Sequence, residues 1–201
     1  HNPEHNLLFG YAVADEMRKE LITLWNTYSF FITYANLDGF DPAVEIDMAT
    51  LTKSDRWIIS KTNKFIESAR RSYDTYQVFH LMSEASQLLD NLSNWYVRRN
   101  RRRFWKSEND DDKIGAYLTL YHVLIDYLKI MAPVIPFITE KIYENLVISV
   151  DENAPKSIHL TTFPKVDNRF TDNDLVAGID IIKDIVGLGR SVRNKENLKI
   201  R

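Results

Sequence analysis

The stretch VFHLMSEASQLLDNLSNWYVRRNRRRFW, residues 78–105, decides how the rest of the chain is interpreted. Its first part places apolar residues at steps of three and four, which form one apolar face of an α-helix over about five turns. These residues are Val78, Leu81, Met82, Ala85, Leu88, Leu89, Leu92 and Tyr96. No glycine or proline separates them from the arginines that follow. The sequence therefore predicts a core helix, N-capped by Asp74, that runs directly into a cationic end.

Helical periodicity extends over most of the remaining chain. It predicts helices over residues 12–34, from Asp55 to residue 69, from about residue 113 to the prolines of MAPVIPF (residues 131–137), over 137–147, and from Asp172 to residue 193. Gly39 and Pro42 make residues 35–42 a loop, and residues 157–164 an extended connector. We therefore expect an all-α fold, an antiparallel helical bundle of about five helices with a kinked Pro-containing helix.

The domain organisation follows from the same pattern. Residues 1–164 are predicted to form the bundle, and residues 165–201 the start of a following C-terminal region. The first helix should contribute a broad apolar face to the core, made of Val13, Met17, Leu21, Leu24, Tyr28, Phe31 and Ile32. The chain lacks an initiator methionine and stops without a capping signal, so we expect a fragment of a longer protein.

Composition excludes several classes of protein. The formal net charge of the 201 residues is −2, so any nucleic-acid binding must come from a local patch. The absence of cysteine excludes disulfides and thiolate metal sites and is compatible with the cytoplasm. No apolar run approaches the roughly 20 residues that span a bilayer. The five histidines share no metal-binding spacing, and the acidic residues are scattered, so no catalytic residue and no metal ligand is predicted.

The arginine segment NWYVRRNRRRFW, residues 94–105, is the candidate binding site. Arginine binds phosphate through two parallel hydrogen bonds, and tryptophan stacks on bases, a mixture suited to single-stranded RNA loops. At about 100° per residue, Arg99 and Arg103 continue the buried face while Arg98 and Arg102 lie beside it. The alternative is internal pairing with acidic residues such as Asp55. Because unpaired buried charge is costly, we expect a division, with Arg98 and Arg102 available and Arg99 or Arg103 paired internally.

Two further charged segments have less specific interpretations. SENDDDK, residues 107–113, is interpreted as a solvated turn, and the alternative of a divalent-metal loop lacks the ligand spacing of a calcium site. The last helix becomes basic towards its end. A solvated face is the default interpretation, and a second contact strip for a polyanion is the alternative; the residues are Lys183, Arg190, Arg193, Lys195 and Lys199.

Three segments together resemble the anticodon-binding domain of class I aminoacyl-tRNA synthetases. They are NWYVRRNRRRFW (94–105), LWNTYSFFITYANLDGFDP (24–42) and MAPVIPFITEKIYENL (131–146), and the resemblance covers nearly the whole chain. ANLDGFDP points to the isoleucyl rather than the valyl or leucyl enzymes. The resemblance implies a helical domain that reads the anticodon stem and loop of an isoleucine-accepting tRNA. The whole enzyme would ligate isoleucine to that tRNA in the cytoplasm with ATP and magnesium, whereas this fragment would be non-catalytic.

The resemblance also implies individual positions and partners. Asn26 and Tyr28 match anticodon-facing polar groups on the first helix, and the helix end that approaches the anticodon carries Trp95, Arg98, Arg102 and Trp105. Trp25 and Trp57 are assigned to the core. The implied partners are tRNA and the catalytic and C-terminal domains of the same chain, with no membrane. The alternatives are a scaffolding bundle that positions neighbouring synthetase domains, with RNA affinity elsewhere, or the same domain of a valyl or leucyl enzyme.

Overall fold

The computed structural model describes residues 10–44, 47, 49–106, 110–196 and 198, and this part of the chain is α-helical without strands. The helices are α1 (Tyr11–Asp38), α2 (Lys53–Asp74), α3 (Val78–Asp90), α4 (Arg98–Trp105), α5 (Asp111–Met131), α6 (Pro136–Tyr143) and α7 (Asn173–Lys195). The π-helix η1 (Asn91–Val97) joins α3 to α4, and the π-helix η2 (Glu144–Ile148) extends α6. Short 3₁₀ turns are η3 (Ile158–Leu160) and η4 (Asn168–Phe170).

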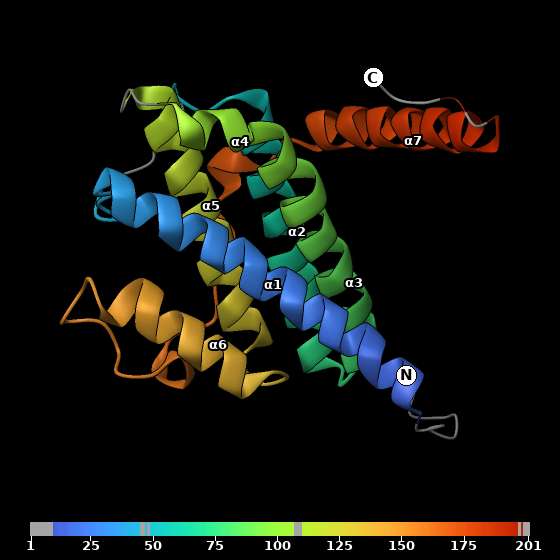
Figure 1. The fold of residues 1–201 in the computed structure, drawn as a ribbon. Coiled ribbons are helices and arrows are strands. Elements are labelled where there is room, and N and C mark those ends of the chain that lie inside the picture. Colours follow the sequence, from blue (N-terminus) through green and yellow to red (C-terminus); the bar gives the residue numbers. More distant parts are fainter. Residues whose placement is uncertain (1–9, 45–46, 48, 107–109, 197, 199–201) are drawn as a thin grey trace.

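Helix α2 lies at the centre of the bundle. It packs against α3, α5 and the start of α7, while α1 crosses the front of the bundle and α6 covers one end (Figure 1). The core is rich in aromatic residues, and Trp57, Tyr96 and Phe104 are each at most 1% exposed. The expectation of an all-α helical bundle is confirmed.

Local capping explains several helix boundaries. A capping box starts α2, in which Thr52 and Asp55 bond reciprocally to each other's backbone N–H. Side chains of Asp110 and Asp172 cap α5 and α7. Gly39, with φ 63°, ends α1 in the left-handed conformation that glycine adopts without steric cost.

Three predicted boundaries were wrong. Asp74 is the last residue of α2 and not the N-cap of α3, which starts after Gln77 without a side-chain cap. Helix α1 continues through residues 35–38, because the signal that ends it is Gly39 itself. The predicted extended connector 157–164 contains the turn η3, whose Ile158 is buried.

The N-terminal half of α1 also departs from the prediction. Leu24, Tyr28 and Phe31 are buried as expected, but Val13, Met17 and Leu21 are exposed, and so is Val78 on α3. Trp25 was assigned to the core and is 41% exposed, whereas Trp57 is fully buried. Periodicity identifies an apolar face, but it cannot tell how far neighbouring helices extend along that face.

Residues after 164 are attached to the bundle through α2. Asn63 Nδ2 donates to the Asp167 carbonyl at 2.8 Å, and the Asp172 N–H donates to Ser60 Oγ at 3.0 Å. Phe170 and Val176 are buried and Asp180 pairs with Lys61 of α2, whereas the part of α7 after Lys183 projects away from the bundle at the end where α4 lies (Figure 1). The boundary predicted at residue 164 stays a prediction.

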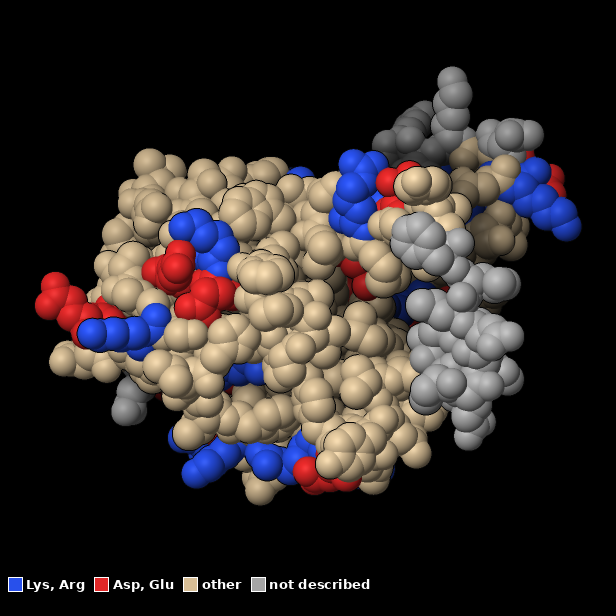
Figure 2. All heavy atoms as spheres, turned by 90° about the horizontal axis from the view of Figure 1, so that it is seen from below, with Lys and Arg blue, Asp and Glu red and all other residues tan. Residues whose placement is uncertain are grey.

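The opposite end of the molecule carries few charges. Figure 2 shows the surface from below, with α6 in view, and uncharged residues occupy most of it, with charged side chains in small scattered groups. None of the described helices is both long and apolar enough to cross a membrane.

Candidate nucleic-acid interface

The arginine segment is the end of one continuous helix made of α3, η1 and α4. The residues at both junctions have right-handed helical dihedral angles, so the chain does not break between Val78 and Trp105. Within η1 the backbone bonds run from residue i to i+5, which places about one more residue in each turn than an α-helix holds. The π-helical segment therefore displaces the faces of α4 from the positions that a uniform α-helical projection gives.

The displaced faces of α4 explain which arginine side chain is buried in the bundle. After η1, the buried side of the helix is formed by Tyr96, Asn100 and Phe104, with Arg103 beside them. Arg103 is paired internally, as predicted. Arg99 was predicted to continue the buried face, and this was wrong, because its side chain is exposed.

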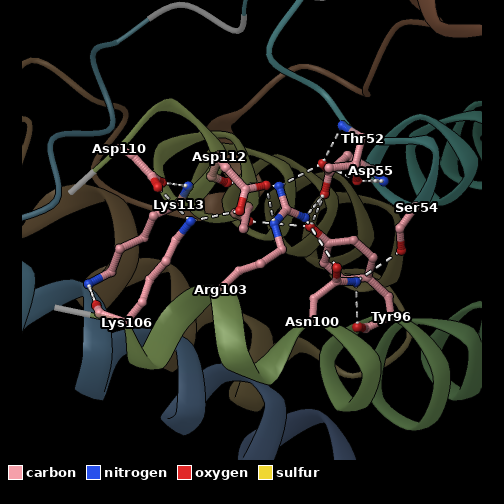
Figure 3. A network of polar contacts seen from close by, with 11 residues as sticks. Thr52, Ser54, Asp55, Tyr96, Asn100, Arg103, Lys106, Asp110, Asp112 and Lys113 are labelled. Atoms are coloured by element: carbon pink, nitrogen blue, oxygen red, sulfur yellow. Dashed lines mark hydrogen bonds and ion pairs between the residues drawn. The ribbon is translucent and has the colours of Figure 1, made fainter. Parts of the chain in front are cut away.

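Arg103 binds a buried carboxylate across the bundle. Its Nη1 and Nη2 donate to the two oxygens of Asp55 at 2.7 and 2.8 Å, and its Nε lies 2.8 Å from Asp112 Oδ1 (Figure 3). The side chain of Asp55 is fully buried and that of Arg103 is 12% exposed. Tyr96 donates its hydroxyl to the same Asp55 carboxylate at 2.5 Å. The network therefore joins the end of the arginine helix to the first turn of α2.

Burial and charge set the protonation of this network. Burial, together with the neighbouring Asp55 carboxylate, raises the pKa of Tyr96 well above its usual value, so the phenol remains a donor. Burial alone would lower the pKa of Arg103, but the hydrogen bonds to Asp55 and the negative charges around the guanidinium, including Asp55 and Asp112, together outweigh it and raise that pKa. Both donors therefore keep their protons throughout the physiological range.

The acidic segment after α4 pairs with this end of the bundle. Lys106 Nζ lies 2.7 Å from Asp110 Oδ2 and 2.8 Å from Asp112 Oδ2. Lys113 is buried and pairs with Asp38 of α1 at 2.6 Å. Residues 107–109 lie outside the described residues. Asp110 and Asp112 do more than the predicted solvated turn, since Asp110 caps α5 and Asp112 pairs with Arg103 of α4.

Four arginines of α4 remain on the surface: Arg98, Arg99, Arg101 and Arg102. Within the described part of the chain, Arg98 and Arg102 have no ion pair, which leaves their guanidinium groups available as expected. Arg101 lies over two rings, 5.8 Å from the centre of Phe30 and 6.0 Å from that of Trp105. An exposed cationic surface with an aromatic edge therefore covers the outer side of α4.

The two tryptophans of the segment differ in their surroundings. Trp95 is half-buried, with the Arg99 guanidinium 4.9 Å and the Lys183 ammonium 5.8 Å from its ring centre. Both contacts lie within the range of cation–π attraction. Trp105 is 53% exposed. Trp105 therefore offers an accessible ring for stacking, whereas Trp95 joins α4 to α7.

The two predicted positions on α1 also differ. Asn26 is exposed and lies one helical turn before Phe30, on the same side of α1. Tyr28 is only 6% exposed, and its hydroxyl accepts a hydrogen bond from Asn145 Nδ2 at 3.0 Å. The structure thus leaves Asn26 exposed on the side of α1 that carries Phe30 but turns Tyr28 towards the core and η2.

Sequence reasoning missed several residues of this region. Phe30 packs edge-on against Phe104 at 5.2 Å and also supports Arg101. Asp55 was only one of several acidic candidates, and Lys183 was assigned to a solvated face, although its ammonium lies 5.8 Å from both Trp57 and Trp95. Periodicity could have suggested Phe30 but not the partners that it meets across the bundle.

Metal binding finds no support in the side chains that the structure describes. Among them, no group of three histidine, aspartate or glutamate residues could hold a metal ion.

The bundle presents exposed arginines and a tryptophan at the end of one core helix, an arrangement suited to an RNA-binding domain. Residues 55–201 match the model of the anticodon-binding domain of tRNA ligase, so the chain belongs to this family.

The relatives specify the branch of the family. The chain is 47% identical over 189 residues to the isoleucine–tRNA ligase of Clostridium novyi, a match that covers 94% of this chain and 18% of that protein. The isoleucine–tRNA ligase of Clostridium tetani is 47% identical to this chain, and that of Dehalococcoides mccartyi (strain CBDB1) is 43% identical. Each match covers 94% of this chain, and it covers 18% of the first relative and 19% of the second. The chain thus spans about a fifth of these relatives. The resemblance to the isoleucyl enzymes is confirmed.

Proposed function

We propose that this chain serves as the anticodon-binding domain of an isoleucine–tRNA ligase and that the outer side of α4 contacts the anticodon stem and loop of an isoleucine-accepting tRNA. The observation that carries the proposal is the set of arginines left without internal ion pairs on α4, beside an exposed tryptophan. Loops of RNA expose both phosphates and unstacked bases, and this surface offers a partner for each.

Each proposed contact has a distinct chemical role. Arg98 and Arg102 bind phosphate oxygens, and Trp105 stacks on an unpaired base. Asn26 is exposed on α1 one turn before Phe30, where its amide can donate to and accept from a base. Trp95 contributes by holding Arg99 and Lys183, and Tyr28 by supporting α1 from inside.

The remaining parts of the proposal concern the whole ligase. Such an enzyme would attach isoleucine to its tRNA in the cytoplasm with ATP and magnesium, which would act in its catalytic domain and not in this chain. Its catalytic and C-terminal domains are proposed partners of this domain. Exposed apolar residues of α7 suit contacts of this kind, namely Ile181, Ile185, Leu188 and Val192.

Binding to an anticodon stem-loop RNA tests the proposal. Replacing Arg98 or Arg102 by alanine should weaken binding by about tenfold and reduce the slope of log affinity against log salt by about 1, because one charged phosphate contact is lost. Arg18→Ala is the matched control, since Arg18 is also exposed but lies on the distant half of α1. Equal affinity of the Arg98, Arg102 and Arg18 variants would refute the assignment of this surface.

A scaffolding role is the second candidate, and the exposed apolar face of α7 favours it. In that case RNA would bind elsewhere in the ligase, and footprints of the whole ligase on tRNA would keep their anticodon-loop protection when Arg98 and Arg102 are replaced. Competition between isoleucine, valine and leucine tRNAs distinguishes the isoleucyl assignment from the valyl and leucyl alternatives.

A further inference from the structure

We propose that Asp55 is a positioning residue for RNA binding: it never reaches the RNA, but it fixes the rotation of α4 that presents the arginines. This inference rests on the proposed function of α4 and adds to it a residue on another helix. Asp55 is fully buried, so its side chain does not contact the RNA directly.

The Asp55 carboxylate is itself held rigidly. It accepts hydrogen bonds from the backbone N–H and the hydroxyl of Thr52 at 2.8 and 2.7 Å, within the capping box of α2. The same carboxylate also accepts two parallel hydrogen bonds from Arg103 and a third hydrogen bond from the Tyr96 hydroxyl (Figure 3). A bidentate pair fixes the orientation of the guanidinium plane as well as its distance.

That clamp determines which side chains of α4 face outward. At about 100° per residue, Arg98, Arg101 and Trp105 lie within about 40° of the direction opposite Arg103. With Arg103 drawn inward, these three therefore point to solvent together. Asn100 Nδ2 donates to Ser54 Oγ at 2.9 Å, a second link between α4 and the start of α2.

Helix α4 depends on such links. It forms the last eight residues of the continuous helix, and the end of a helix frays unless side chains hold it to the rest of the fold. It also follows a π-helix, so the straight α-helical register does not extend into it from α3. Loss of the Asp55 clamp should therefore let α4 rotate or fray while the rest of the bundle stays folded.

The sign of the charge effect separates positioning from electrostatics. Replacing Asp55 by asparagine removes a negative charge, which by long-range attraction alone would strengthen binding to RNA. If Asp55 positions α4, Asp55→Asn should instead weaken binding to the anticodon stem-loop RNA by about 2- to 30-fold. The salt slope should also fall, because fewer arginines reach phosphates at once.

Two control variants near α6 reproduce the other consequences of Asp55→Asn, namely the lost negative charge and the lower stability. Glu140→Gln removes the same charge from a carboxylate that accepts hydrogen bonds from Ser157 and Ile158. Leu146→Ala destabilises the bundle through a cavity far from α4. Both should bind RNA like the unmodified chain at a temperature at which circular dichroism shows each variant to be folded.

The outcomes separate the inference from the proposed function. Undiminished affinity of Asp55→Asn, or a loss that Leu146→Ala shares, overturns the inference alone when Arg98→Ala still weakens binding. If Arg98→Ala and Asp55→Asn both bind like the unmodified chain, the proposed function falls together with the inference. Should Asp55→Asn not fold, Arg103→Lys replaces it, since lysine keeps the charge but not the bidentate geometry. Undiminished RNA affinity of Arg103→Lys would then overturn the inference.

Discussion

Helices α4 and α7 both carry cations, yet they are attached to the bundle in different ways. Helix α4 is fixed along its length by Asn100, Arg103 and Phe104, which face the bundle. Helix α7 is attached by its first turns and by Lys183, which donates to Asn91 and lies between two tryptophan rings. The difference shows that positive charge by itself does not define a binding surface. The internal cation of each helix, Arg103 or Lys183, decides how firmly the exposed cations of that helix are held in place.

The largest expected effect compares these two internal cations. Arg103→Met should lower the free energy of unfolding by about 3–5 kcal/mol, because it leaves the buried Asp55 carboxylate without its charged partner. Lys183→Met should cost about 1 kcal/mol, since it removes one hydrogen bond and two cation–π contacts from a half-buried side chain. Urea denaturation of both variants measures the two values. Equal losses would show that α7 is anchored as firmly as α4.

An effect of intermediate size, on the pH dependence of stability, contrasts the paired Asp55 with Asp126, a carboxyl group whose burial disfavours its charge. Burial raises the pKa of Asp126 on α5 to about 6, although Lys129 opposes the shift. The folded state then binds this proton more tightly than the unfolded state, so the stabilisation is present below about pH 4 and is lost as pH rises through about 6.

Replacement of Asp126 measures that loss. Asp126→Asn should be more stable than the unmodified chain at pH 8 by about 1–3 kcal/mol, and the gain should shrink towards pH 4. The measurement is a series of urea titrations between pH 4 and 8. A stability difference that does not change with pH would contradict the raised pKa.

The smallest expected effect concerns the exposed face of α7. Ile185→Gln and Leu188→Gln should each change the free energy of unfolding by less than about 0.5 kcal/mol, because these side chains contact solvent. Val176→Thr, on the buried first turns of the same helix, is the control and should lower the melting temperature measurably. A large loss from Leu188→Gln would mean that this face packs on the bundle in solution.

Much of the fold could be predicted from the spacing of apolar residues. The helical spacing of apolar residues over 78–96 is a local property of the sequence. It correctly identifies Leu81, Leu88 and Tyr96 as core residues. Capping is equally local, so Asp172 is correctly predicted to open α7. The prediction was wrong for Asp74, because α2 continues through this residue and α3 begins only after Gln77, so the capping preference of the aspartate is not used.

The candidate site was harder to predict. A uniform helical projection assigned Arg99 and Arg103 to the same face, but η1 changes the number of residues per turn between the core helix and the arginines. The roles of Trp95 and Trp105 differ for a similar reason. Both are aromatic residues within one segment, and only the approach of Lys183 from α7 occupies one of them.

The sequence by itself determined that this chain is an all-α bundle with an arginine-rich helix end, since helical periodicity and composition are properties of neighbouring residues. The tertiary structure decided which arginine is buried, which tryptophan remains open and which half of α1 is covered. Those outcomes depend on contacts between residues far apart in the chain, such as Asp55 and Arg103, 48 positions apart. Burial makes that single pair strong, because a charge removed from water requires a partner of opposite sign.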